Sequence, residues 1–324
     1  MYNKAFLHVK DIVNSTPVTL ILFPTNRCNL GCKYCIYYKH GRSDAFNPTD
    51  ELDISMIEHI ISKFHGAGGR AVQISGGGEP TLHPHFDRIL RYMNSRELDI
   101  GIITNGTNRI DISELGCLKW VRVSVDAANG EIYKDIKGYD KLSSVFTNVS
   151  AMVNSKKNGT SIGTSFIICR DNYNDIVEFA RLSKIAGANY CRYTYALTPN
   201  TINEYSDIND NIIGLLSKAE EYADDTFSVN AQYERLDLMV PTIRDYNRCI
   251  HSNLVPVVGA DGWLYPCCEL SYISKYKIRH IPTDCKFGHD IDARGCPPCD
   301  MDSKNRCYNA ILDSYTKCKD VNFL

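Results

Sequence analysis

Three cysteines in one short loop constrain this chain more than any other feature. Cys28, Cys32 and Cys35 follow the apolar run 18–23, with three and then two residues between them. Three thiolates on one loop can hold three irons of a cubane cluster and leave the fourth iron open to a small molecule. A structural zinc site usually takes four protein ligands from two paired clusters, and packed free cysteines are the other alternative. The spacing favours the iron-sulfur cluster.

Short β-rich runs alternate with helical patterns from residue 18 to about residue 195, which is typical of parallel α/β folds. Six repeats are fewer than the eight of a closed (β/α)8 barrel, and an open doubly wound sheet would also fit. Periodicity leaves both architectures open. We expect strands at 18–23, 71–75, 100–104, 120–125, 161–169 and 190–196, and helices at 55–65, 85–94, 173–186 and 209–224.

Composition bounds the class of protein. The chain has 324 residues, 44% of them apolar, which predicts one large domain with a smaller one beside it. A formal charge of -2, without Lys/Arg runs, argues against a nucleic-acid partner. The longest early apolar run is too short for a signal sequence or a membrane span. These features predict a cytoplasmic protein with no membrane partner.

The cysteines fall into two separate regions. The chain has 14 of them, and eight lie between Cys249 and Cys318. This density is well below that of a disulfide scaffold, so metal or cluster ligation explains the count better. The C-terminal region begins with an expected hairpin turned at Asp261-Gly262. Because the rest of it is turn-rich, it is expected to need a metal centre to fold.

A glycine run follows the second expected strand, in the sequence Ser75-Gly-Gly-Gly-Glu-Pro80. Consecutive glycines let a backbone approach a ligand closely. Neither the P-loop pattern nor the dinucleotide-binding pattern is present. A tight turn would be the better interpretation if this run stood alone.

The cysteine spacing, with Tyr34 just before the third cysteine, resembles the signature of the radical S-adenosylmethionine (SAM) enzymes. The resemblance implies a [4Fe-4S] cluster on Cys28, Cys32 and Cys35, with SAM bound at the open iron. It also implies reductive cleavage of SAM to a 5'-deoxyadenosyl radical. The implied fold is α/β, a partial (β/α)6 TIM-type barrel over residues 1–225.

Further strand ends match positions where enzymes of this family contact SAM. The glycine run resembles the family's GGE motif, and the turn after the third strand and the end of the fourth match contacts to the ribose and carboxylate. Taken singly, several of these residues are also common in ordinary turns. Their order along the chain is what matches the family. The implied SAM-binding residues are Tyr34, Gly77, Gly78, Glu79, Asn105, Ser124, Asp126 and Asn172.

Four C-terminal cysteines form a second candidate centre. Cys249, Cys267, Cys296 and Cys299 would ligate a cubane fully, so this centre would pass electrons. Their arrangement resembles the SPASM domain of radical SAM enzymes, or its shortened twitch form, over residues 226–324. It predicts one auxiliary [4Fe-4S] cluster.

Two features leave this assignment open. Cys307 and Cys318 do not match the spacing of a full SPASM domain, which puts a second auxiliary cluster in doubt. A zinc site on Cys285, His289, Cys296 and Cys299 is the rival interpretation.

Three residues are candidates for contact with a substrate. Arg192 and Tyr195 end the sixth strand, where alternate side chains point into a barrel. Cys268 follows an expected ligand and is either a packed thiol, a ligand in place of its neighbour, or a hydrogen-atom donor.

The resemblance implies a radical SAM oxidoreductase that abstracts a hydrogen atom from a small polar, sugar- or aminocyclitol-like substrate. The outcome would be dehydrogenation or epimerisation, with an electron from a flavodoxin or ferredoxin. Two alternatives are a maturase of a ribosomally made peptide and a non-catalytic iron-sulfur or zinc scaffold.

Overall fold

A single curved sheet organises the protein. The computed structural model describes residues 8–38, 43–196, 204–233, 243–299 and 301–317. The sheet has ten strands in the order β10-β9-β8-β1-β2-β3-β4-β5-β6-β7. The strands are β1 (Thr19–Leu22), β2 (Ala71–Ile74), β3 (Asp99–Thr104), β4 (Leu118–Ser124), β5 (Ser161–Ile168), β6 (Tyr190–Tyr195), β7 (Ser228–Ala231), β8 (Val257–Val258), β9 (Trp263–Tyr265) and β10 (Arg279–His280).

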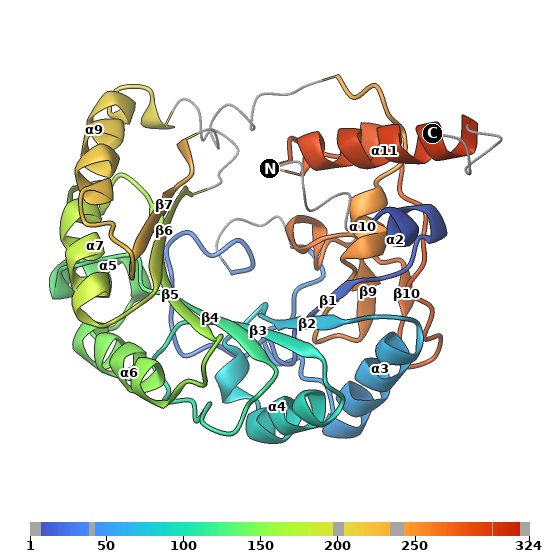
Figure 1. The fold of residues 1–324 in the computed structure, drawn as a ribbon, viewed down its shortest axis with the longest axis horizontal. Helices are drawn as coiled ribbons and strands as arrows, with labels where there is room; N and C mark the ends of the chain where they lie inside the picture. The colour runs from blue at the N-terminus through green and yellow to red at the C-terminus, as the bar shows by residue number, and fades with distance from the viewer. Residues whose placement is uncertain (1–7, 39–42, 197–203, 234–242, 300, 318–324) are drawn as a thin grey trace.

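The strands β1 to β7 run parallel to their neighbours, and helices on the outer face connect all of them except β3 and β4, which a loop joins (Figure 1). The sheet does not close, so the fold is an open partial barrel of α/β class. The helices are α2 (Val9–Asn14), α3 (Ile54–Gly66), α4 (Phe86–Ser95), α5 (Gly130–Lys137), α6 (Leu142–Ser155), α7 (Ile176–Ile185), α9 (Asn209–Glu220), α10 (Ile250–Leu254) and α11 (Asp302–Lys317).

All six expected strands are present, and the barrel interpretation is confirmed. The sequence did not lead us to expect α5, α6 or β7. The strand β7 reads Ser-Val-Asn-Ala, which lacks the apolar character of the other parallel strands. It pairs with β6 through its backbone, with Tyr190 opposite Ser228, and forms the edge of the sheet next to β6.

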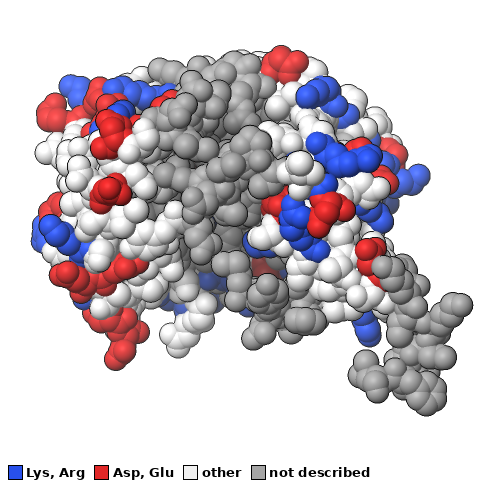
Figure 2. Space-filling view, turned by 90° about the horizontal axis from the view of Figure 1, so that it is seen from above, with Lys and Arg blue, Asp and Glu red and all other residues white. Residues whose placement is uncertain are grey.

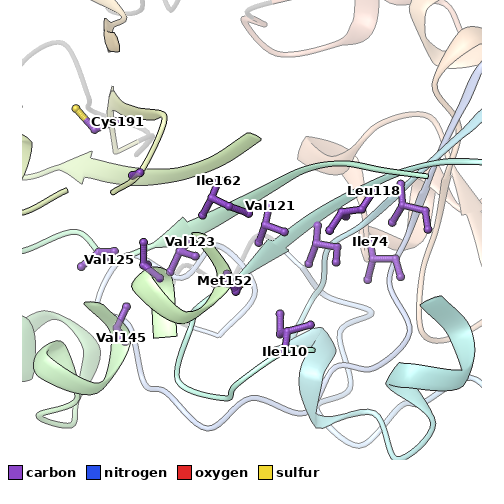
Figure 3. Packing of buried hydrophobic residues seen from close by; sticks show 14 of the residues in the cluster. Ile74, Ile110, Leu118, Val121, Val123, Val125, Val145, Met152, Ile162 and Cys191 are labelled. Carbon is purple, nitrogen blue, oxygen red and sulfur yellow. The ribbon is translucent and has the colours of Figure 1, made fainter. Parts of the chain in front are cut away.

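The hydrophobic core lies between the sheet and the outer helices. Side chains on a strand alternate between the two faces, and Val121 and Val123 of β4 point into the helical layer with Ile162 of β5 (Figure 3). Met152 of α6 packs against this set and is 1% exposed. The opposite face of the same strands is therefore left to line the concave side of the barrel.

The C-terminal strands extend the same sheet beyond β1. The strand β8 runs parallel to β1, with Ile21 opposite Val257, and β9 returns antiparallel to it. The amide of Gly262 donates to the carbonyl of Gly259 at 3.0 Å, and Gly262 has a φ of 77°. The expected hairpin is therefore present, with Gly262 in the left-handed conformation that suits glycine at the end of its turn.

The charged surface is mixed. Lys and Arg are interspersed with Asp and Glu on both sides of the face shown in Figure 2. Within the described ranges, we find no helix that combines the length and the apolar character needed to cross a bilayer.

Candidate functional site

One cavity of about 330 Å³ lies at the carboxyl ends of the parallel strands. Sites in α/β barrels lie beyond this end of the strands. The cavity brings together the three cysteines of the first loop, the glycine run and the ends of β3, β4 and β6. Its lining includes Cys28, Cys32, Tyr34, Cys35, Gly77, Gly78, Glu79, Asn105, Ser124, Asp126, Lys137, Thr194 and Glu269.

The cysteine loop is held against the end of α5. The amide of Gly31 donates to the carbonyl of Lys137 at 2.8 Å, and the amide of Lys33 donates to the carbonyl of Ile136 at 2.9 Å. These main-chain bonds satisfy two carbonyls that the end of a helix leaves without partners. The loop therefore has a fixed place although it has no regular secondary structure of its own.

The glycine run packs against the residues just before Cys28. A Cβ on Gly77 would lie 2.2 Å from Oδ1 of Asn26, and a Cβ on Gly78 would lie 2.1 Å from the carbonyl oxygen of Arg27. The amide of Glu79 also donates to that carbonyl, at 2.8 Å. Close backbone approach, which only glycine allows, is thus needed to join the two motifs.

Glu79 uses both carboxylate oxygens within the protein. Thr104 Oγ1 donates to Oε1 at 2.6 Å, the amide of Asn105 donates to Oε2 at 2.6 Å, and Thr81 also donates to Oε1. Burial raises the pKa of this carboxyl, while these hydrogen bonds lower it. The Glu79 carboxylate thus joins the glycine run to the end of β3.

Asp126 is the centre of a buried polar group beneath the cysteine loop. Tyr34 Oη and Lys137 Nζ both donate to Asp126 Oδ2, and the amide of Ile167 donates to Oδ1 at 2.6 Å. Asp126 is fully buried and has a φ of 67°, a conformation that Asp adopts more readily than most residues. The Asp126 charge raises the pKa of Lys137 against the opposing effect of burial.

Three residues expected to bind SAM have hydrogen-bond partners within the protein. Both Asp126 oxygens and the Tyr34 hydroxyl are engaged with protein partners. Asn172 is fully buried and donates to the carbonyls of Asp126 and Ile167, each at 2.8 Å. Tyr34 and Asp126 line the cavity and Asn172 lies behind Asp126, and contact of these residues with SAM stays a prediction.

Two hydroxyls complete the lining. Ser124 ends β4 on the concave side. Thr194 Oγ1 is buried at the cavity and has no hydrogen-bond partner within the described residues. A buried hydroxyl without a partner is costly, so its position fits a cavity that takes up a polar ligand. We had not singled out Thr194 from the sequence.

The side chains of Arg192 and Tyr195, both candidates for contact with a substrate, point to opposite faces of β6. Arg192 faces the concave side with Thr194, and it donates to Gln232 Oε1 at 2.8 Å. The Tyr195 phenol points the other way, donates to Asn209 Oδ1 at 2.8 Å and packs against Tyr205. Alternation thus places the Tyr195 phenol in the helical layer, although Tyr195 is among the residues that line the cavity, and its contact with a substrate stays a prediction.

A second, narrower cavity brings together the four C-terminal cysteines Cys249, Cys267, Cys296 and Cys299. The amide of Met301 donates to the sulfur of Cys299 at 3.3 Å, and Asn305 Nδ2 donates to that of Cys249 at 3.4 Å. Glu269 lines both cavities, and Cys268 beside it is exposed. Four thiols are the donor set of an iron-sulfur cluster, and N–H groups are directed at the sulfurs of two of them, Cys249 and Cys299.

The rival zinc ligands are directed elsewhere. Cys285 Sγ donates to the carbonyl of Ile281 at 3.1 Å and packs against the main core. His289 Nδ1 lies 2.9 Å from the carbonyl of Phe287. Neither residue lines the cavity of the four cysteines. Cys318 lies outside the described residues.

The thiols of the first loop fit a cluster site only after losing their protons. Burial raises the pKa of the Cys28 thiol to about 11 and raises that of Cys32. Iron binds thiolates, so cluster assembly must displace these protons. The positive charge of Lys137 lowers the pKa of Cys32 against the effect of burial.

Two curated relatives have related sequences. GTP 3',8-cyclase 1 of Mycobacterium tuberculosis is 28% identical over 187 residues, 54% of this chain and 51% of that protein. The chain thus spans about half the length of this relative. The tungsten-containing aldehyde ferredoxin oxidoreductase cofactor-modifying protein of Pyrococcus furiosus is 25% identical over 283 residues, 84% of this chain and 74% of that protein.

Solved structures share the fold at low sequence identity. SuiB of Streptococcus suis bound to S-adenosylmethionine matches with a TM-score of 0.61 and 14% identity, over 98% of this chain and 74% of that one. The structure of anSMEcpe with bound AdoMet matches with a TM-score of 0.60 and 19% identity, over 94% and 83%. Residues 22–183, half of the chain, match the sequence profile of the Radical SAM superfamily. The chain therefore belongs to the Radical SAM superfamily.

Proposed function

We propose that the protein binds a [4Fe-4S] cluster on Cys28, Cys32 and Cys35 together with SAM, and uses them to abstract a hydrogen atom from a substrate C–H bond. Membership of the superfamily implies the cluster and SAM. When bound, the cluster supplies the electron for reductive cleavage of SAM. The observation that carries the proposal is that one cavity of about 330 Å³ combines the three cysteines with the glycine run.

In this scheme, the residues of this chain bind SAM and the substrate and orient them. The backbone of Gly77 and Gly78 lines the cavity, because Glu79 holds the run against the end of β3 and the Gly78 amide donates to the carbonyl of Thr25 at 3.2 Å. Ser124 and the Thr194 hydroxyl, which has no hydrogen-bond partner among the described residues, supply polar contacts along the strand ends, and Asn105 lines the cavity beside them. The enclosing walls exclude water from a reactive intermediate, which is the protein's share of such chemistry.

We further propose that Cys249, Cys267, Cys296 and Cys299 hold one auxiliary [4Fe-4S] cluster in a SPASM- or twitch-like domain over residues 226–324. Their shared cavity supports this assignment. Glu269 lines both cavities, which supports a substrate position between the two centres. Passage of an electron from a substrate radical to this centre, with loss of a proton, would give dehydrogenation; return of a hydrogen atom from a thiol donor would give epimerisation.

The substrate class we favour is a small polar molecule. The two relatives named above carry names that refer to a nucleotide and to a cofactor. A peptide substrate is the second candidate, because structures that share the fold include SuiB bound to precursor peptide SuiA and anSMEcpe with a peptide. A one-electron donor such as a flavodoxin or ferredoxin completes the scheme.

The decisive test is release of 5'-deoxyadenosine. Protein reconstituted anaerobically with iron and sulfide is incubated with SAM and dithionite, and the product is measured by chromatography. We expect release from the wild type and none from Cys32→Ala, with Cys117→Ala as the control because Cys117 lies away from both cavities. Absence of product from a fully reconstituted wild type contradicts the proposal.

A further inference from the structure

The concave face of β4 carries a cation below the cavity. Side chains of β4 alternate, so Trp120, Arg122 and Ser124 point away from the helical layer that holds Val121 and Val123 (Figure 3). Ser124 lines the cavity. Arg122 therefore lies one step deeper on the same face, with Ile103 opposite it on β3 and Gly163 opposite it on β5.

Two aromatic rings form the floor around this guanidinium. A Cβ on Gly163 would lie 2.1 Å from Cζ of Tyr190, so this ring lies against the bare backbone of β5. The Trp120 ring covers Gly101 of β3 in the same way, at 2.3 Å. The Arg122 guanidinium lies 5.6 Å from the centre of the Trp120 ring. Such stacking orients a guanidinium and leaves its N–H edge available for an anion.

The guanidinium has no counter-charge from the described part of the chain. Arg122 is half-buried, and the described groups that act on its charge are the Tyr190 phenol and the Cys268 thiol, with no carboxylate among them. A cation removed from water without a partner is unfavourable. Burial accordingly lowers the pKa of Arg122.

A second guanidinium, that of Arg192, lies on the same face as Arg122. Arg192 of β6 shares the concave face, and both Arg122 and Arg192 act on the Tyr190 phenol between them. Cys268, which comes from the segment after β9, acts on Arg122 and on Tyr37 next to the cysteine loop. Two guanidinium groups thus lie near Tyr190 on the concave face, and Cys268 lies close enough for its charge to act on Arg122.

We propose that Arg122 binds an oxyanion, a carboxylate or a phosphate, carried by the substrate. The inference rests on the proposed function, because it places the substrate between the SAM cavity and the floor formed by β4 and β6. Guanidinium groups recognise both anions through paired N–H···O bonds. The substrate would then lie with its anionic end on Arg122 and its remaining part directed toward the cavity and Cys268.

The test measures anion binding to the reconstituted protein with SAM present. Inorganic phosphate and acetate are titrated at constant ionic strength, and binding is followed by the shift of the thermal unfolding midpoint. We expect saturable binding to the wild type, weakened about tenfold or more in Arg122→Met and less in Arg122→Lys. Arg88→Met is the control, because Arg88 is exposed and pairs with Glu58 on the outer face. The tighter of the two probes identifies the anionic group.

The outcomes separate this inference from the proposed function. No saturable binding to the wild type, or equal weakening in Arg122→Met and Arg88→Met, overturns the oxyanion site. If Arg122→Met does not fold, Arg122→Lys and Arg122→Gln decide the question by the same comparison. Release of 5'-deoxyadenosine without any substrate is measured in parallel. If the wild type releases it and anion binding does not depend on Arg122, only the oxyanion site fails.

Discussion

The Lys137 ammonium lies 5.6 Å from the centre of the Tyr34 ring, and both side chains donate to the same carboxylate oxygen of Asp126. Tyr34 belongs to the cysteine loop, whereas Lys137 ends the helix whose carbonyls accept from that loop. The side-chain and main-chain contacts therefore act on the same few residues. Together these protein contacts hold the loop in position.

Replacing Lys137 with Met tests this buried ion pair. The change leaves the Asp126 carboxylate buried without its cation, so we expect the free energy of unfolding to fall by about 3–5 kcal/mol. We also expect less iron per chain after reconstitution, because the cysteine loop loses its support. Urea unfolding and iron analysis measure the two effects. Lys134→Met on the same helix is exposed and should change neither; equal losses in both variants would contradict this account.

The Tyr272 hydroxyl joins the C-terminal region to the segment before Cys28. It donates to Asn26 Oδ1 at 2.6 Å and accepts from the amide of Ala260 at 2.9 Å. Tyr272→Phe leaves both groups buried and unpaired, which should cost about 1–3 kcal/mol. The thermal midpoint checks this, with the exposed Tyr139→Phe as control. An unchanged midpoint in Tyr272→Phe would show that these bonds contribute nothing.

Acidification should destabilise the protein through His83. Its Nε2 lies 2.8 Å from the carbonyl of Leu52, and its Nδ1 accepts from the amide of His85, so the folded state holds a neutral ring. Burial lowers the pKa of His83 from its ordinary value of 6.5. Below this pH the unfolded chain binds the proton more readily, so the free energy of unfolding should fall as the pH drops from about 7 to about 5.

The variant His83→Gln should reduce this pH dependence, measured as urea unfolding across the same range. The matched control is His85→Gln, because His85 is exposed. Part of the slope should remain in His83→Gln, since burial also lowers the pKa of His289. An identical slope in wild type and His83→Gln would exclude the assigned role.

Metal analysis of cysteine variants distinguishes the two C-terminal assignments. Cys267→Ala should lower the iron content from about eight to about four per chain, because one cubane is lost. Cys285→Ala should leave it unchanged, since this thiol donates to Ile281 and lies outside the second cavity. Zinc in the wild type that is lost in Cys285→Ala would favour the rival site instead.

The sequence predicted the parts of the structure that local patterns encode. Buried parallel strands are short apolar runs, so six of them could be located, and the glycine run could be placed at the end of β2. The strand β7 escaped because Ser228 and Asn230 give it no apolar pattern. Alternation also showed that Arg192 and Tyr195 lie on opposite faces, but not which face meets the helices. Packing of Tyr193 and Tyr195 in the core decides that.

Lys137 and Arg122 were not predicted from the sequence, because their surroundings depend on contacts between distant parts of the chain. In the sequence, Lys137 is indistinguishable from an exposed lysine in the last turn of a helix. The structure shows that it is buried and paired with Asp126. Arg122 lies within an expected strand, where one charged residue suggests an exposed face. It is the curvature of the sheet that turns this face into a concave floor. Neither the burial of Lys137 nor the concave position of Arg122 can be inferred from the residues next to them in the sequence.

The pairing of β1 with β8 sets an order of events during synthesis. Val257, which pairs with β1, and Tyr272, which bonds to Asn26 after it, are made more than 200 residues later than the strand that leads into the cysteine loop. Until then one edge of β1 is unpaired and the loop lacks part of its cover. The part of the cover that β8 and Tyr272 supply can therefore reach the loop only after residues 257–272 have been made.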